Sequence, residues 1–422
     1  MIDYPKFTVI IPVKDRVKYL YYTLKTCTMQ EYPNFEVIVA DDASTDGTQD
    51  MVRRFSAFDK RIRLIAREQR VGMRDNFELA LAEVMEGYVL ALGGDDGLLP
   101  NGIQKMFDVI QSTGTKLLTW CPPSFEYPSE AKPNGQFYFY RHRGLKKVNS
   151  KEYMERQSRI LNYLSDIECP MFYVKGVAHI DLVNKVKSRS KDGRFYSCPT
   201  PDGYSGIVLA GEVDHFYFSG EPFTLFGASP ASQGAAYLSK SEKARKDSAE
   251  FFKFSEGQTM HAELASQPYS PLMALMTVDY LYTARDLPGW KGSVVDVDFK
   301  QVLAKALNEL ASRYADNTLE RELAILEAIA KHHKLTEYYQ QLLDKQKRKS
   351  TIPQYRLWAI SKNNIYVDAK EFGVSNVFEA ANSIPAIMAS SRYFGLSLYW
   401  KLFKESAKLY FARKKTTGKF NS

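Results

Sequence analysis

Short apolar runs alternate with amphipathic segments along the first hundred residues. The apolar runs, rich in β-branched residues, occupy 7–13, 35–42, 61–67 and 88–92. Runs of this length and composition predict buried strands. The segments between them, which carry apolar positions at helical spacing, are 16–30, 48–58 and 74–85. Strands that alternate with helices in this way predict βαβ units and a mainly parallel sheet.

The pattern becomes less regular after the fourth strand and changes character near residue 237. The stretch 121–150 is rich in Pro, Tyr and Lys, and its QFYFYRHR run predicts an edge strand or a hairpin arm. Helices are expected at 151–164 and 176–188, before loops and short strands. Long helical patterns then follow, at 239–265, 270–285, 298–315, 318–348 and 395–413. We therefore expect an α/β domain over residues 1–237 and an α-helical domain over residues 238–422.

Composition narrows the class of protein. With 422 residues, 45% hydrophobic and 25% charged, the chain has the balance of a soluble globular protein. No apolar run is long enough to predict a membrane span, and the first residues lack signal-peptide features. The four cysteines show neither metal-ligand nor redox spacing, so we expect reduced thiols in a cytoplasmic protein. The net charge of +8 suits anionic partners, but no motif accompanies it that would predict nucleic-acid binding.

Two pairs of aspartates follow predicted strands. Asp41 and Asp42 end the second strand, and Asp95 and Asp96 follow the fourth within the stretch ALGGDDGLLP. Ligands of parallel sheets bind at the carboxyl ends of the strands, so both pairs are candidates for one site. Carboxylates are ligands that Mg²⁺ or Mn²⁺ prefers, and such an ion leaves positions for diphosphate oxygens. Helix capping by the first pair and a solvated turn at the second remain the alternatives.

Taken in order, these segments resemble the family-2 glycosyltransferases of the GT-A fold. The segments that carry the resemblance are VIIPVKDR, FEVIVADDASTDGT, REQRVGMRDNFELAL and YVLALGGDD, the last being similar to the strand with the DxD-type metal motif. The resemblance is good over residues 7–102 and looser to residue 234. It implies an α/β, Rossmann-like, mainly parallel sheet with flanking helices, divided into a nucleotide-binding half (1–102) and an acceptor-binding half (103–237), followed by an α-helical C-terminal region.

The resemblance also implies roles for individual residues. The residues around a nucleoside-diphosphate sugar would be Pro12, Val13, Asp15, Asp41, Asp42, Arg74 and Asp95. Within this set, Asp42 would contact a uracil-like base or the ribose. Asp96, together with Asp95, would bind the Mn²⁺ or Mg²⁺ ion that holds the diphosphate.

Two positions depart from the family pattern. Lys14 and Asp15 stand where the family often has Tyr-Asn, which puts base stacking there in doubt. Gly93 stands where the first Asp of the metal motif usually lies. Some family members share that second arrangement, so we interpret it as a variant in which Asp95 and Asp96 carry the metal.

An inverting transfer needs a general base beside the acceptor hydroxyl. In the family this is an Asp beyond the metal motif, at the start of a helix, and Asp202 in CPTPDGYSGIVLA fits that description. Asp192 and Asp214 are the alternatives, and a capping role for Asp202 remains open. His215 is expected on the acceptor side.

The last predicted helix, 395–413, carries an aromatic and apolar face beside a lysine face. Such a helix can lie on an anionic membrane surface, which would bring the enzyme to a lipid-linked acceptor at the inner face of the cell membrane. Packing on its own domain and a homo-oligomer interface are the alternatives.

Two functions of different class follow. The first is a metal-dependent inverting hexosyl- or N-acetylhexosaminyltransferase. It would move a sugar from a nucleoside-diphosphate sugar, with UDP as the expected nucleotide, to a glycan or polyprenyl-lipid-linked acceptor in surface polysaccharide biosynthesis. The second is a non-catalytic sugar-nucleotide or glycan-binding module on the same fold. A nucleotidyltransferase is disfavoured because PVKDRVKYL lacks the glycine-rich, basic loop of that class.

Overall fold

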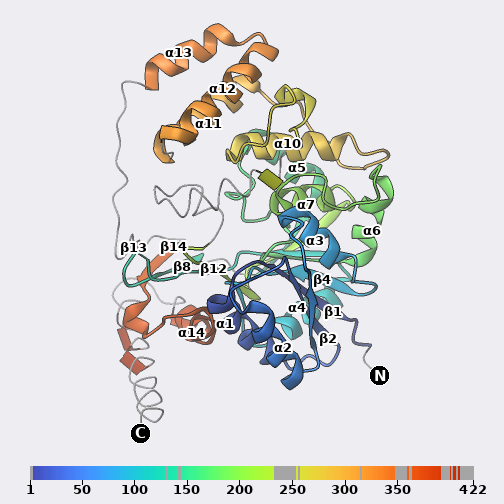
Figure 1. Cartoon of the computed structure of the whole chain (residues 1–422), viewed down its shortest axis with the longest axis vertical. Helices are drawn as coiled ribbons and strands as arrows, with labels where there is room; N and C mark the ends of the chain where they lie inside the picture. Colours follow the sequence, from blue (N-terminus) through green and yellow to red (C-terminus); the bar gives the residue numbers. More distant parts are fainter. Residues whose placement is uncertain are drawn as a thin grey trace.

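The computed structural model describes residues 3–129, 132–140, 144–231, 253–254, 257–313, 316–346, 359–360, 364–390, 400, 403–404 and 407–408. Two sheets lie side by side in the lower part of the molecule, and a group of helices lies above the larger one (Figure 1). The strands are β1 (Phe7–Val13), β2 (Phe35–Asp41), β3 (Ile62–Ala66), β4 (Tyr88–Ala91), β5 (Gly97–Leu98), β6 (Leu117–Trp120), β7 (Ser124–Glu126), β8 (Gln136–Tyr140), β9 (Leu145–Asn149), β10 (Gly176–His179), β11 (His215–Ser219), β12 (Thr224–Ala228), β13 (Ala359–Ile360) and β14 (Asn364–Asp368).

The helices cover both faces of the larger sheet and form the upper part of the molecule. They are α1 (Val17–Thr28), α2 (Thr48–Phe58), α3 (Met73–Leu81), α4 (Gly102–Thr113), α5 (Ser150–Ile160), α6 (Ile180–Arg189), α7 (Pro201–Ala210), α10 (Met273–Arg285), α11 (Phe299–Arg313), α12 (Asp316–His332), α13 (Thr336–Gln346) and α14 (Val377–Ser390), with short 3₁₀ turns at Ala262–Leu264 and Lys370–Phe372.

The larger sheet has the strand order β3-β2-β1-β4-β10-β6-β11-β9. Strands β3, β2, β1 and β4 pair in parallel, while β10 is antiparallel to both of its neighbours. β6 and β11 therefore run in the same direction as β1, and their carboxyl ends share its edge. The expected α/β class, with a mainly parallel central sheet and a helical C-terminal region, is confirmed.

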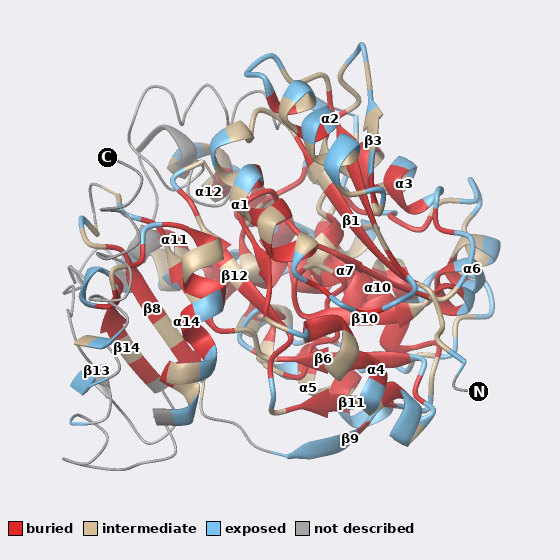
Figure 2. Ribbon diagram, turned by 90° about the horizontal axis from the view of Figure 1, so that it is seen from below, coloured by how far each residue is buried: buried red, intermediate tan, exposed pale blue. Residues whose placement is uncertain are grey.

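Both faces of this sheet are buried, which explains why its strands are almost continuously apolar. Val9 and Ile11 of β1 enter a core with α1, α2 and α4. Ile10 points to the opposite face, into a core that includes α3, α6, α7 and α10. Figure 2 shows this buried layer through the sheet and the helices next to it. The stiff double-sided packing fixes the positions of the strand ends.

Two helical expectations need correction. Residues 176–188 are not one helix, because Gly176–His179 forms β10 and only the following residues form α6. A side chain at Gly176 would lie 2.5 Å from the Met171 carbonyl oxygen, so this strand passes too close to its neighbour for a larger residue. The expected helix at 318–348 is two helices, with Lys334 left-handed (φ 59°) between them. The Leu335 N–H donates to the Ala330 carbonyl at 2.7 Å, as in a helix C-terminal cap.

Two other helical expectations fall largely outside the described residues. Most of 239–265 and 395–413 is not described, so their helices stay predictions. At the end of the first segment, residues 257–261 are not helical. Among the helices that the structure describes, none combines the length and the apolar character needed to cross a membrane.

The C-terminal segment returns to the first part of the chain. The QFYFY part of the QFYFYRHR run forms β8, which pairs with β7 as a hairpin arm and with β14 on its other side, so it is not an edge. Beside this smaller sheet, α14 packs against α1, with the Lys25 ammonium 4.2 Å from the centre of the Phe378 ring. Above the larger sheet, α10 packs against α7. A division near residue 237 stays a prediction, but the two parts share cores.

These contacts predict that the α/β part depends on the returning segment. Deleting residues 359–422 removes buried side chains such as Ile365, Phe372, Val377 and Ile384, each less than 2% exposed. Full burial of such a side chain contributes about 1.5–3 kcal/mol, so we expect a large fall in Tm or an insoluble product. A chain ending at Ser390 keeps β14 and α14 and should retain a Tm close to that of the full chain. Equal Tm values for the two truncated chains would contradict this prediction.

Candidate active site

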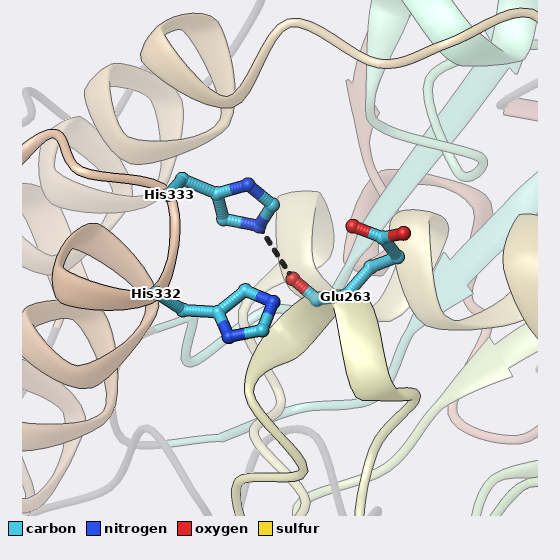
Figure 3. Close-up of side chains that lie close together, drawn as sticks. All are labelled: Glu263, His332 and His333. Atoms are coloured by element: carbon cyan, nitrogen blue, oxygen red, sulfur yellow. Dashed lines mark hydrogen bonds between the residues drawn. The ribbon is translucent and has the colours of Figure 1, made fainter.

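One group of metal-type ligands lies among the helices. The side chains of Glu263, His332 and His333 can place ligand atoms within 4.8 Å of one another (Figure 3). However, His333 Nε2 lies 2.7 Å from the backbone oxygen of Glu263, and the His333 ring stacks on Phe299 with 3.5 Å between centroids. His332 is exposed. These contacts explain His333 as a packing residue, so they give no reason to place a metal ion at this group.

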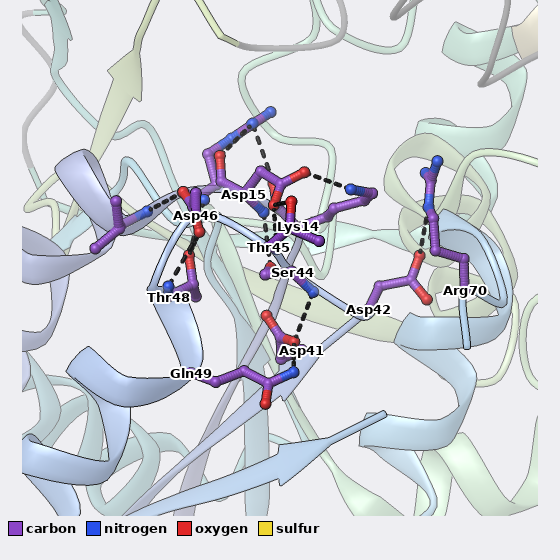
Figure 4. A network of polar contacts seen from close by, with 12 residues as sticks. Lys14, Asp15, Asp41, Asp42, Ser44, Thr45, Asp46, Thr48, Gln49 and Arg70 are labelled. Carbon is purple, nitrogen blue, oxygen red and sulfur yellow. Dashed lines mark hydrogen bonds and ion pairs between the residues drawn. The ribbon is translucent and has the colours of Figure 1, made fainter. Parts of the chain in front are cut away.

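Three of the predicted nucleotide-binding residues, Asp15, Asp41 and Asp42, lie together where β1 and β2 end (Figure 4). Val13 pairs with Asp41, and the Asp42 N–H donates to the Val13 carbonyl at 2.9 Å. The Asp15 N–H donates to Ser44 Oγ at 2.8 Å, and Asp15 Oδ1 accepts from the Thr45 N–H at 2.8 Å. The two strand ends are thus tied to each other. Burial alone would raise the pKa of Asp15, but the Lys14 ammonium and the Thr45 N–H outweigh it and hold this pKa below its usual value.

Left-handed backbone at two ordinary residues shapes these loops. Asp15 has φ 50° and Ala43 has φ 57°. Such conformations cost energy in residues other than glycine and often occur at functional sites. Here they turn the chain sharply after each strand, with Pro12 partly exposed just before the first turn.

Asp41 and Asp42 have different surroundings. Asp42 accepts from the Val71 N–H at 2.7 Å and the Gly72 N–H at 3.2 Å, so it holds the loop before α3. Asp41 Oδ1 accepts from the Ser44 N–H and from Gln49 Nε2. Asp41 Oδ2 is buried and has no hydrogen-bond donor in the part of the chain that the structure describes. A buried carboxylate oxygen without a donor is costly unless a ligand supplies one.

Arg74 lies in the first turn of α3 and is partly buried. Its Nε donates to Asp75 at 2.9 Å, and Arg194 donates to the same carboxylate at 2.7 Å. The expected donor-side arginine is therefore held in an ion-pair group beside the strand-end site.

The second acid pair is deeply buried just beyond β4. Asp96 is fully buried and Asp95 is 6% exposed. Asp96 accepts from the Gly93 N–H at 2.6 Å and from the Gly227 N–H at 2.8 Å, while Asp95 Oδ2 accepts from the Ser229 N–H at 3.2 Å. The end of β12 and the residue after it are thus bound to the acid pair. A side chain at Gly227 would lie 1.7 Å from the Asp95 carbonyl oxygen, so only glycine fits there.

Two neighbouring buried acids disfavour double ionisation. Burial raises the pKa of Asp95, and burial together with the Asp95 charge raises the pKa of Asp96 well above its usual value. The charge of Arg16 opposes the shift at Asp95. A divalent cation would remove the repulsion, and carboxylate oxygens are the ligands that Mg²⁺ and Mn²⁺ take. The donor set therefore fits such an ion.

Asp202 lies at the start of α7, directly after Pro201 at the first helical position. Its side chain is partly buried, and burial raises its pKa to about 7. The ionisable side chains that face it are four tyrosines, Tyr163, Tyr173, Tyr196 and Tyr269. A carboxyl group with a pKa near 7 is suited to accept a proton at neutral pH.

Tyr173 connects the two acidic groups. Its hydroxyl interacts with the Asp96 carboxylate, and the charges of Asp95 and Asp202 also act on it. The acid pair and Asp202 are thus all near enough to one phenol for their charges to act on it.

The other acceptor-side residues lie elsewhere. His215 is the first residue of β11, which runs parallel to β6, so it lies at the opposite edge of the sheet from the acid pair. His215 and Asp214 are both exposed. Asp192 is also exposed and accepts from Ser190 Oγ and the Arg194 N–H. An acceptor-side role for His215 therefore gains no support from its position.

Sequence reasoning missed several residues at this site. Arg16 lies against Gly94, where an added side chain would meet its Cβ at 3.1 Å, and it donates to the Ala231 carbonyl. Ser229 and Tyr173 contact the acid pair from distant segments. In the sequence, the glycine at position 93 was the one indication that another side chain could occupy the space beside the acid pair.

Comparison with known proteins gives a consistent result for the first part of the chain. The family model described as Glycosyl transferase family 2 matches residues 8–173. Glycosyltransferase GlyG of Streptococcus pneumoniae serotype 4 is 25% identical over 133 residues, which cover 32% of this chain and 42% of that protein. The teichuronic acid biosynthesis glycosyltransferase TuaG of Bacillus subtilis is 30% identical over 104 residues, which cover 25% of this chain and 41% of that protein. The chain thus spans less than half the length of either relative.

Among solved structures, S. aureus TarS 1–349 in complex with UDP-GlcNAc is similar to this chain with a TM-score of 0.45. The two are 16% identical, and the match covers 85% of this chain and 95% of the TarS chain.

Proposed function

We propose that this chain, whose residues 8–173 match the family model described as Glycosyl transferase family 2, transfers a sugar from a nucleoside-diphosphate donor to a hydroxyl group of a glycan. The observation that carries the proposal is the placement of three acidic side chains. Asp95 and Asp96 lie at the carboxyl edge of the sheet, and the charges of these two residues and of Asp202 all act on the Tyr173 phenol. The Asp95–Asp96 pair suits binding of a cation and its diphosphate, and Asp202 suits the role of proton acceptor.

The nucleotide is proposed to bind over the ends of β1 and β2. Asp41 Oδ2 needs a hydrogen-bond donor, and the imide N–H of uracil can supply one. We therefore propose a UDP-sugar, with Pro12, Val13 and Asp15 beside the base and Asp42 holding the neighbouring loop. Guanine also presents an N–H to a carboxylate, so a GDP-sugar is the competing donor. Arg74 is proposed to lie on the donor side.

The reaction is proposed to invert the anomeric centre. Asp202 would accept the proton of the acceptor hydroxyl. The hydroxyl oxygen would then attack the anomeric carbon from the side opposite the departing diphosphate. Asp95 and Asp96 would hold a Mg²⁺ or Mn²⁺ ion, which when bound would stabilise the negative charge on the diphosphate. Arg16, beside Asp95, would add a fixed positive charge near the same group.

The acceptor and the place of action are also proposals. The name of TuaG associates that relative with teichuronic acid biosynthesis, which supports a surface polysaccharide as the acceptor here, as a free or a polyprenyl-lipid-linked glycan. A cytoplasmic enzyme that reaches the inner face of the membrane through 395–413 agrees with the lysine-rich composition of that segment. The C-terminal helices would alternatively form a homo-oligomer.

A donor screen tests the proposed function. The full chain is incubated with UDP-, GDP-, dTDP- and CMP-sugars, each with Mn²⁺, with Mg²⁺ or with EDTA, and release of the nucleotide is measured. We expect slow hydrolysis of one UDP-sugar that stops when EDTA is added. Binding of a donor without release, even with acceptor glycans present, would instead favour a non-catalytic binding module. Neither binding nor release with any donor would contradict the proposal.

A further inference from the structure

The space above Gly93 is occupied by a tyrosine from a distant segment. A Cβ atom built on Gly93 would lie 2.3 Å from the Tyr173 hydroxyl, 2.8 Å from Asp96 Oδ2 and 3.1 Å from Asp95 Oδ1. These three oxygens therefore converge on the side of Gly93 from which a side chain would project. The φ angle of Gly93 is not left-handed, so close approach and not backbone conformation explains the glycine.

Backbone hydrogen bonds fix the segment that delivers Tyr173. The Ala91 N–H donates to the Phe172 carbonyl at 3.1 Å, and the Val174 N–H donates to the Ala91 carbonyl at 2.8 Å. On the other side, the Phe172 N–H donates to Ser205 Oγ of α7 at 3.0 Å. Tyr173 is thus held between the end of β4 and the helix that begins beside Asp202.

The surroundings of the Tyr173 hydroxyl make it a hydrogen-bond donor to carboxylates. The ordinary pKa of a phenol is about 10, so this side chain is protonated at neutral pH. A neutral phenol has one O–H to donate, and Asp96 is the carboxylate with which it interacts.

We propose that the Tyr173 hydroxyl takes the place of the carboxylate that this chain lacks at Gly93, and that it acts as a positioning residue by orienting Asp96 toward the divalent cation. This inference rests on the proposed function. Groups that hydrogen-bond to metal-ligating carboxylates typically change metal affinity by about 10–100-fold when they are removed. A tyrosine that served only to pack would tolerate loss of its oxygen.

The test is Mn²⁺ affinity, measured on the full chain with UDP in excess from the loss of the free-ion electron paramagnetic resonance signal. Tyr173→Phe should weaken Mn²⁺ binding about 10–100-fold. Gly93→Ala should weaken it at least as much, because the added methyl group would collide with the hydroxyl and press on both carboxylates. The loss in the double variant should be smaller than the product of the two single losses, because Tyr173→Phe removes the hydroxyl with which the methyl group collides. Far-UV circular dichroism shows whether each variant is folded.

Tyr153→Phe is the matched control. Tyr153 is buried, and its hydroxyl lies 3.1 Å from Cys169 Sγ, so its loss should leave Mn²⁺ affinity unchanged. If folded Tyr173→Phe binds Mn²⁺ with wild-type affinity, the inference is overturned and the proposed function still stands. The same holds if the losses of Mn²⁺ affinity in the two single variants multiply in the double variant. If the wild-type chain itself binds no Mn²⁺, both the inference and the metal-dependent mechanism are wrong.

Discussion

Asp202→Asn is expected to lower the rate of sugar transfer by about 10²–10⁴-fold, the usual contribution of a general base. Asparagine has nearly the same shape, but it cannot accept the proton of the acceptor hydroxyl. Donor binding should change little, because Asp202 is assigned to the acceptor proton and not to the nucleotide or the cation. The measurements are the transfer rate at saturating donor and the dissociation constant of the donor.

Asp214→Asn and Asp192→Asn are the matched controls for this change. Both carboxylates are exposed, and each was an alternative base on sequence grounds. We expect both variants to transfer sugar at nearly the wild-type rate. If one of them loses activity while Asp202→Asn retains it, the base has been assigned to the wrong aspartate.

The pH dependence gives an independent test of Asp202. Burial raises its pKa to about 7, and only the ionised form accepts a proton. The transfer rate should therefore fall as the pH drops below about 7, and this limb should be absent from the residual activity of Asp202→Asn. A wild-type rate that stays constant from pH 5 to pH 8 would contradict the assignment.

The same pKa predicts an effect on stability. The folded-state pKa lies above the unfolded value of about 4, so the folded state binds more protons between these two values and stability falls as the pH rises. Asp202→Asn removes the buried charge. The variant should match the wild type in Tm near pH 4 and exceed it at pH 8. A lower Tm at pH 8 would show that the carboxylate is held by favourable contacts.

Local patterns predicted the first half of the sheet because each strand there is buried on both faces. The runs at 7–13 and 35–42 correspond to β1 and β2 within a residue. Patterns failed where strands are short or paired over long distances. The four residues of β10 lie within what looked like a helix, and β14 pairs with β8 from more than two hundred residues away. No local periodicity encodes such a partner.

The candidate site also has features that the sequence predicts and features that it does not. The two aspartate pairs could be placed on one edge of the sheet because parallel strands end together. The donor for each carboxylate could not be predicted, since Asp42 is satisfied by the loop at Val71 while Asp41 keeps a free oxygen. Gly93 was visible as a missing carboxylate, but nothing in the sequence indicated that Tyr173 fills its place.

His215 illustrates what sequence distance leaves open. Its closeness in sequence to the predicted acceptor region suggested a place in the cleft, but residues that begin and end one strand lie at opposite edges of a sheet. Ser219, at the other end of β11, pairs with the end of β6 on the edge that the acid pair occupies. Sequence distance alone therefore does not say which end of β11 lies nearer to the acid pair.

Asp95→Asn is expected to lower the metal-dependent transfer rate by about 10³-fold, because a bound cation stabilises transition-state charge by several kcal/mol. Asp95 is preferable to Asp96 as the first target. Asp96 accepts hydrogen bonds from Gly93 and Gly227 on its two oxygens, so an amide there would oppose one N–H with another and disturb the fold. Asp95 retains slight exposure, and an asparagine oxygen can still accept from the Ser229 N–H.

The readouts are Mn²⁺ affinity, the transfer rate at increasing Mn²⁺ concentration, and Tm without metal. Replacing one acid removes a buried like-charge repulsion, so Asp95→Asn should not lower the metal-free Tm. Addition of Mn²⁺ should raise the Tm of the wild type and have little effect on that of the variant. Asp108→Asn, an exposed acid on α4, controls for the loss of one negative charge. A variant at position 95 that binds Mn²⁺ and transfers sugar like the wild type would show that the acid pair has a structural role, and that the end of β12 and the residue after it are bound to it only to complete the fold.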